Sequence, residues 1–156
     1  MSPVSEASPA GSAPWSLGRL GDLDDVELIR RFEARTIVQA DWTHTEHCRV
    51  GYIYLCSLDW ASAVHRMRRG IMRLNIAQGV PNSTMRGYHE TITIAWLRLI
   101  AAALERGPRG RRSLDFLMCN PALLCAKTLS RYFSAQLLED SRSRRHFTPA
   151  DRRPLP

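Results

Sequence analysis

Hydrophobic residues recur at every third or fourth position along most of the chain, the spacing that places them on one face of an α-helix. The pattern predicts four main helices and then shorter helical segments, over residues 22–37, 41–58, 59–78, 88–106, 113–118 and an interrupted 121–138. No alternation of apolar and polar residues is long enough to predict a strand. We therefore expect an all-α fold, a single-domain helical bundle of four main helices with shorter C-terminal helices.

Residues that start or stop helices divide the chain into three parts. Asp22, Asp24 and Asp25 provide an N-cap and a negative first turn for the first helix, and Asp59 is a candidate cap for the third. Residues 1–21 are rich in Pro, Gly, Ser and Ala, a composition that predicts a flexible leader. Residues 22–141 form the predicted bundle domain, and 142–156 a polar, basic tail.

Composition fits one globular domain, with 44% hydrophobic and 24% charged residues in 156. The net charge of +7 comes from 21 arginines and a single lysine, and the excess lies in residues 105–156. A basic end can hold phosphates, but no aromatic platform or known nucleic-acid motif accompanies it. We therefore expect no nucleic-acid partner. A non-catalytic helical interaction protein, or a nucleic-acid-binding protein that uses this arginine-rich end, stays the alternative function.

The most apolar run, residues 92–104, is interrupted by Arg98 and is too short to cross a bilayer. No secretory signal precedes it, so we expect a cytoplasmic protein with no membrane partner. The four cysteines form no CxxC pair and are interpreted as reduced, buried residues rather than as a disulfide or zinc site. The oligomeric state is open, a homo-oligomer included.

Ionisable residues occupy inward positions on three predicted helices. His44 and His47 continue the apolar stripe of the second helix, His89 continues that of the fourth with Glu90 at its margin, and Glu33 occupies an inward position on the first. One buried histidine alone is most simply a neutral residue with a hydrogen bond. Three of them with Glu33 favour a metal site, because facing helices of a bundle bring such side chains together.

Other polar residues fit less specific roles. Arg68 and Asn75 tilt toward the inner face of the third helix, where an arginine binds either a ligand carboxylate or, equally well, Glu33 or Glu90. His65, beside several arginines, is expected at the surface. The chain has no GxSxG, P-loop, GxGxxG or HExxH motif, which argues against hydrolase and nucleotide-binding functions.

Two segments, WTHTEHCRVGYIYL (42–55) and GYHETITIAW (87–96), carry a resemblance, together with RRGIMRLNIAQG (68–79) and the C-terminal FTPADRRPLP. Over residues 32–156 the chain resembles a family of small helical bacterial proteins. That family includes the indole ring-expanding, quinoline-forming enzyme that helps make the quinaldic acid unit of thiostrepton-type thiopeptide antibiotics.

The resemblance implies a metal-dependent oxygenase. Its reaction would be oxidative ring expansion of a 2-methylindole-3-pyruvate-type keto acid toward a quinoline ketone, with dioxygen as co-substrate. In this interpretation His44, His47 and His89 hold the metal and Glu33 completes or supports the shell, with Glu90 as a further candidate. The ligand types suit Fe(II) best, while Zn, Mn, Ni or a rarer metal such as vanadium stays open.

The same interpretation assigns residues to the aromatic keto acid. Arg68 or Arg49 would anchor its carboxylate, with Asn75 nearby on the inner face. Four aromatic side chains would line a pocket for the indole ring, although such residues more often belong to the core: Trp42, Tyr52, Tyr88 and Trp96.

Overall fold

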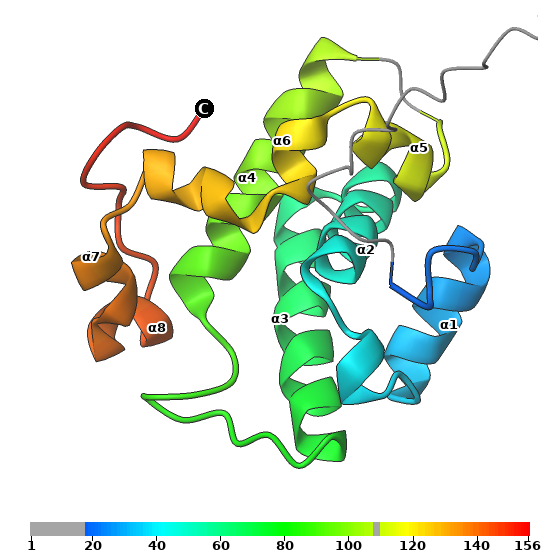
Figure 1. Ribbon diagram of the computed structural model, residues 1–156, viewed down its shortest axis with the longest axis horizontal. Coiled ribbons are helices and arrows are strands. Elements are labelled where there is room, and N and C mark those ends of the chain that lie inside the picture. The colour runs from blue at the N-terminus through cyan, green and yellow to red at the C-terminus, as the bar shows by residue number, and fades with distance from the viewer. Residues whose placement is uncertain (1–17, 108–109) are drawn as a thin grey trace, which may run out of the picture.

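The computed structural model describes residues 18–107 and 110–156, and every regular element in these ranges is helical, as predicted (Figure 1). Four longer helices pack together, and shorter C-terminal helices follow. In chain order the elements are α1 (Asp25–Ala34), η1 (Gln39–Asp41), α2 (His44–Ser57), α3 (Trp60–Ala77), α4 (Glu90–Arg106), α5 (Ser113–Met118), α6 (Pro121–Leu124), η2 (Ala126–Arg131), α7 (Ala135–Glu139) and α8 (Ser141–Arg145). Most of the predicted leader, residues 1–17, lies outside the described residues.

Capping residues set the ends of the helices. The backbone N–H of Glu27 donates to Asp24 at 2.7 Å and that of Ser62 to Asp59 at 3.0 Å, as predicted for both caps. The first helix ends earlier than predicted, because Arg35 adopts a left-handed conformation with φ of 60°. Ile37, which had extended the apolar pattern, lies in the segment after the helix, and its side chain is buried there.

The segment 121–138, predicted as an interrupted helix, forms three short elements. Pro121 starts α6, and Cys125 takes an extended conformation that ends it after four residues. The Thr128 hydroxyl then donates to the Ala122 carbonyl at 2.6 Å, which folds η2 back onto α6. Local polar bonds therefore break a helix that the apolar spacing alone predicts.

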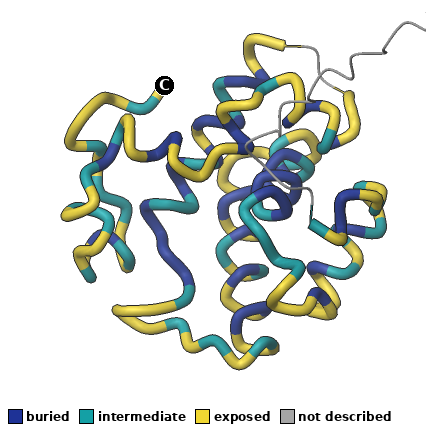
Figure 2. Tube along the Cα trace, viewed as in Figure 1, coloured by how far each residue is buried: buried dark blue, intermediate teal, exposed yellow. Residues whose placement is uncertain are grey.

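α2 lies in the middle of the bundle, in contact with α1, α3, α4 and α5. Figure 2 shows buried residues concentrated in α2 and along α4. Two core clusters result. One lies among α1, α2 and α3, and the other lies among α2, α4 and the short helices; they include Leu28, Phe32, Val50, Met67 and Leu74 in the first, and Tyr52, Leu99, Ile100, Phe116 and Leu117 in the second.

Two glycines allow helices to approach closely. A Cβ atom at Gly70 on α3 would lie 2.3 Å from the ring of Phe32 on α1, and one at Gly51 on α2 would lie 3.1 Å from Leu97 on α4. No larger residue fits at Gly70 without displacing the phenyl ring. No helix among the described residues has both the length and the apolarity needed to cross a membrane.

Residues 142–156, predicted as a separate tail, pack against α4. The Thr91 hydroxyl on α4 donates to the Ser143 carbonyl at 2.6 Å and accepts from the Thr148 backbone N–H at 3.0 Å. Farther along, the Arg98 guanidinium lies 5.4 Å from the ring centre of Phe147. The segment is polar, as its composition indicated, but it belongs to the bundle because its own backbone carbonyls and N–H bond to the Thr91 hydroxyl of α4.

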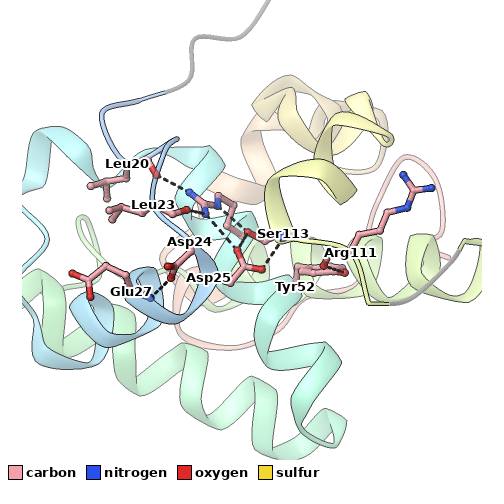
Figure 3. Close-up of polar contacts among 9 residues, drawn as sticks. Leu20, Leu23, Asp24, Asp25, Glu27, Tyr52, Arg111 and Ser113 are labelled. Atoms are coloured by element: carbon pink, nitrogen blue, oxygen red, sulfur yellow. Dashed lines mark hydrogen bonds and ion pairs between the residues drawn. The ribbon is translucent and has the colours of Figure 1, made fainter.

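A buried arginine on α2 joins the segment around the start of α1 to the start of α5, and Figure 3 labels the residues that it contacts. The Arg49 side chain is 0% exposed, and it donates to the carbonyls of Leu20 at 2.7 Å and Leu23 at 2.6 Å and to the Ser113 hydroxyl at 2.9 Å. Its guanidinium also lies 3.4 Å from the Asp25 carboxylate, which accepts from the Ser113 backbone N–H at 2.8 Å. Arg49 is therefore saturated by protein groups, and its prediction as a substrate anchor is wrong.

We expect Arg49→Met to lower the free energy of unfolding by about 3–5 kcal/mol, because it removes the buried donor group that bonds to the Leu20 and Leu23 carbonyls and to the Ser113 hydroxyl. Urea denaturation followed by circular dichroism measures the loss. Arg30→Met is the control, since Arg30 pairs with Glu27 in solvent, and it should change stability little. Equal losses in the two variants would contradict a special role for the buried guanidinium.

Candidate functional site

The four predicted metal ligands do not converge. Glu33 is exposed on α1, where its carboxylate accepts from the Tyr54 hydroxyl at 3.0 Å and from Arg66 at 3.2 Å. Its inward placement was wrong, because Leu28 and Phe32 form the buried face of this short helix and Glu33 lies one residue beyond that face.

In His44 and His89, the Nε2 atom lies within hydrogen-bonding distance of a backbone carbonyl. His44 Nε2 lies 2.8 Å from the Leu123 carbonyl, and the ring packs 4.4 Å from that of Trp96. His89 Nε2 lies 2.9 Å from the Leu138 carbonyl. His89 is also the N-cap of α4, since its Nδ1 accepts from the Ile92 backbone N–H at 3.3 Å. Both rings therefore tie segments of the fold together.

His47 differs from the other two. Its Nδ1 lies 2.7 Å from the Thr43 carbonyl one turn earlier, and its ring packs 4.0 Å from the ring of Trp42. Within residues 18–107 and 110–156, no hydrogen-bonding group pairs with its Nε2. With Nδ1 donating to the carbonyl, Nε2 carries a lone pair that is available to a ligand.

Burial keeps these imidazoles neutral. It lowers the pKa of His47 to about 4, against a smaller opposing effect of the Thr43 carbonyl. Burial also lowers the pKa of His44 and of His89, and the nearby positive charge of Arg144 contributes to the shift at His89. At neutral pH, His47 is therefore a proton acceptor and not a proton donor.

Two pockets that share four lining residues lie beside His47, between α2, α3 and α4, and together they are called here the two-part cavity. The first part, called here the apolar chamber, has a volume of 280 Å³ and is lined by His44, His47, Thr93, Trp96 and the apolar residues Met67, Ile71, Ile92, Leu97 and Ile100. The second, the polar chamber, has 390 Å³ and shares His47, Ile71, Ile92 and Thr93 with the first. Its polar lining is Gln39, Asn75, Gln78, Tyr88, His89 and Arg144. His47 thus borders both chambers.

Arg144 supplies the positive charge of the polar chamber. Its Nη1 donates to the carbonyls of Gly87 at 3.0 Å and Tyr88 at 3.3 Å, and no carboxylate pairs with it among the residues described. Sequence reasoning missed this residue because it placed residues 142–156 outside the bundle. The arginine run in α8 was the only signal, and it did not show which member turns inward.

Of the two roles predicted for Arg68, an ion pair within the protein or a bond to a ligand carboxylate, the structure has the ion pair. It pairs with both carboxylate oxygens of Glu90, one of them at 3.0 Å, and the Tyr88 hydroxyl donates to the same carboxylate at 2.6 Å. Burial alone would raise the pKa of Glu90, but these hydrogen bonds outweigh it and lower the pKa. Glu90 is thus committed to this pair and not available as a metal ligand.

The predicted aromatic pocket is partly formed. Trp42 and Tyr88 line the polar chamber and Trp96 the apolar one, whereas Tyr52 lies in the core, stacked on Phe116 at 4.3 Å. Asn75 also lines the polar chamber, where its amide donates to Asn82 at 2.8 Å.

The remaining predictions concern surface and thiol groups. His65 is exposed, as expected. Of the four cysteines only Cys48 is buried, so the expectation of burial was wrong for three of them. All three exposed cysteines, Cys56, Cys119 and Cys125, lie at or beyond helix ends.

The donor set does not fit a resident metal held by several side chains. Among the described residues, no three His, Cys, Asp or Glu side chains lie close enough to share an ion. His44 and His89 direct Nε2 at backbone carbonyls, and burial raises the pKa of the Cys48 thiol, which keeps it protonated. Among the predicted metal ligands, which all lie in the described part of the chain, His47 alone has an imidazole nitrogen without a protein partner.

Comparisons with known proteins do not add a family to this picture: no family model, no curated protein and no solved structure matches the chain. The resemblance carried by the two histidine motifs therefore stays a prediction. The interpretation of the cavity depends on its geometry.

The pKa of His47 predicts how stability changes with pH. Because the folded-state pKa of about 4 lies below the ordinary value of 6.5, the unfolded chain binds a proton between these pH values that the folded chain does not. The free energy of unfolding should therefore fall by about 2–3 kcal/mol on this account as the pH drops from neutral through 4. Urea titrations at several pH values should show a smaller fall for His47→Gln than for the unmodified protein. His65→Gln, at the exposed position, should keep the full fall, and identical pH dependence in all three would contradict the assignment.

Proposed function

We propose that this chain is an enzyme that binds a small aromatic keto acid in the two-part cavity and uses His47 as a general base. The observation that carries the proposal is the unpaired Nε2 of a neutral imidazole at the border of the two chambers. His47 is half-buried, and an acceptor at the wall of a cavity without a protein partner is available to a donor on a ligand or on water. At a functional site, such a group is a candidate for proton transfer.

The linings of the two chambers support this class of ligand. An aromatic ring in the apolar chamber would contact Trp96 and aliphatic side chains, as rings do in small-molecule sites. A carboxylate in the polar chamber would lie near Arg144, whose guanidinium has no acidic partner among the described residues. Together the volumes of 280 and 390 Å³ suit a bicyclic ring with a short acidic side chain.

The chemistry that this arrangement supports is proton abstraction next to a carbonyl. In an aryl pyruvate, the carbon between the ring and the keto group carries acidic protons, and removal of one produces an electron-rich enolate. His47 would take that proton on Nε2, and the Thr43 carbonyl would stabilise the imidazolium through Nδ1–H. The resemblance then supplies the oxidant: dioxygen would convert a 2-methylindole-3-pyruvate-type acid toward a quinoline ketone.

His47→Gln should lower kcat for 2-methylindole-3-pyruvate at least 100-fold, since it removes the base but keeps a polar side chain of similar size. Arg144→Gln should instead raise KM about 10-fold or more through loss of the charged contact to the carboxylate. The assay is dioxygen consumption together with mass spectrometry of the products. His65→Gln and Arg145→Gln serve as matched controls at exposed positions and should behave as the unmodified protein does. Full activity of His47→Gln, with its fold intact, would overturn the role of His47.

A metal-dependent form of this oxygenase, with Fe(II), Zn, Mn, Ni or vanadium, stays a prediction from the resemblance. Because no three side-chain ligands gather among the described residues, we expect any ion to be weakly held and removed by dialysis against a chelator without a change in melting temperature. Elemental analysis of the purified protein, before and after dialysis, measures this. Stoichiometric metal that survives dialysis, and that His47→Gln loses but His65→Gln keeps, would contradict the expectation and favour the metal-dependent form.

A further inference from the structure

Another cavity, with a volume of 520 Å³, shares no lining residue with the two chambers beside His47. It is enclosed by the C-terminal half of α4, the turn between α5 and α6, η2 and the last residues of the chain. Leu99 and Ala103 from α4 and Leu123 from α6 give it an apolar floor, and the ring of Tyr132 lines one wall. A volume of this size suits a small organic molecule.

Three arginines from separate segments meet at this cavity: Arg106 at the end of α4, Arg131 at the end of η2, and Arg153 near the C-terminus. None of the lining side chains is acidic. No ion pair engages any of the three guanidiniums in the part of the chain that the structure describes. Like charges brought together without an anion repel one another, and a bound anion would remove that repulsion.

The segments that carry these arginines are held in place by backbone bonds. The Tyr132 carbonyl accepts from the N–H of Arg152 at 2.9 Å and of Arg153 at 3.4 Å, and the Arg152 side chain donates to the Ser130 carbonyl at 2.8 Å. These bonds bring Arg131 and Arg153 to the wall of the cavity that Arg106 also lines, and all three side chains are exposed. Arginines along a single helix usually form a solvated face, whereas these three come from separate segments of the chain.

We propose that this cavity, called here the arginine cavity, binds a small organic phosphate. Guanidinium groups bind phosphate oxygens through paired, charge-assisted hydrogen bonds, and three of them suit a group with two or more negative charges. The apolar floor and Tyr132 would contact an aromatic or apolar body attached to that phosphate. This site is independent of the histidine cavity and of the function proposed for it.

Cys119 provides a reporter for occupancy. It is exposed, it lines the arginine cavity, and its Sγ accepts from Arg111 Nη1 at 3.1 Å. Cys125 is also exposed but does not line this cavity, so it serves as an internal reference. A ligand seated over the three arginines would shield the first thiol from alkylation and leave the second unchanged.

The test uses ADP as the probe, with the full chain in low-salt buffer and calorimetry as the readout. We expect ADP to bind, and the triple variant R106Q/R131Q/R153Q to weaken the binding at least 10-fold. The matched control R69Q/R73Q/R86Q removes the same charge from exposed positions outside this cavity and should keep the affinity. Adenosine should fail to bind and pyrophosphate should bind more weakly than ADP, which separates the contribution of the phosphates from that of the ring.

Alkylation of Cys119 by iodoacetamide, followed by mass spectrometry, should slow on addition of ADP while that of Cys125 does not. Circular dichroism verifies that each variant is folded. If the triple variant is unstable, Arg131→Gln alone takes its place, and it should weaken ADP binding by a smaller factor. Absence of ADP binding at millimolar concentration would overturn the proposal. An equal loss of ADP affinity in the two triple variants would overturn the proposal too, because the loss would then follow from the lower net charge and not from the arginine cavity. Neither outcome depends on turnover of a keto acid.

Discussion

The arrangement of the helices depends on the burial of one charged group, the guanidinium of Arg49. An ion of this size loses several kcal/mol of hydration on burial, so its place in the fold is stable only if protein acceptors replace water. Here the acceptors come from the segment before α1, from the start of α1 and from the start of α5. Segments more than eighty residues apart in the sequence are therefore held at one side of α2.

This constraint also decides which way the histidines face. Arg49 follows His47 by two residues, which on a helix is a rotation of about 200°. With the arginine directed at α1 and α5, His47 faces α3 and α4, where the two chambers lie. The Arg49 network and His47 thus lie on opposite sides of α2, and the bonds of Arg49 fix the direction in which His47 points.

The sequence predicted best those features that depend on contacts between residues close together in the chain. The caps at Asp24 and Asp59 and the four main helices follow from local hydrogen bonding and apolar spacing. It predicted poorly what depends on partners distant in the chain. An inward-facing histidine is equally consistent with a metal ion, a cavity or a carbonyl of another segment, and His44 and His89 found carbonyls at Leu123 and Leu138. Arg144 enters the polar chamber only because residues 142–156 fold back onto α4, and apolar spacing does not encode that.

The capping role of His89 has a consequence for its protonation. Because Nδ1 accepts a backbone N–H and Nε2 lies against a carbonyl, the ring is held in the single tautomer that carries its proton on Nε2. A second proton would have to enter on Nδ1, where it would break the cap and place a positive charge at the positive end of the α4 macrodipole. The start of α4 and α7 are therefore joined by an imidazole whose compatible state is neutral, alongside the bonds that Thr91 and Arg144 form between the start of α4 and the C-terminal segment. In this part of the molecule, the position of one hydrogen atom on His89 determines whether the first turn of α4 keeps its cap.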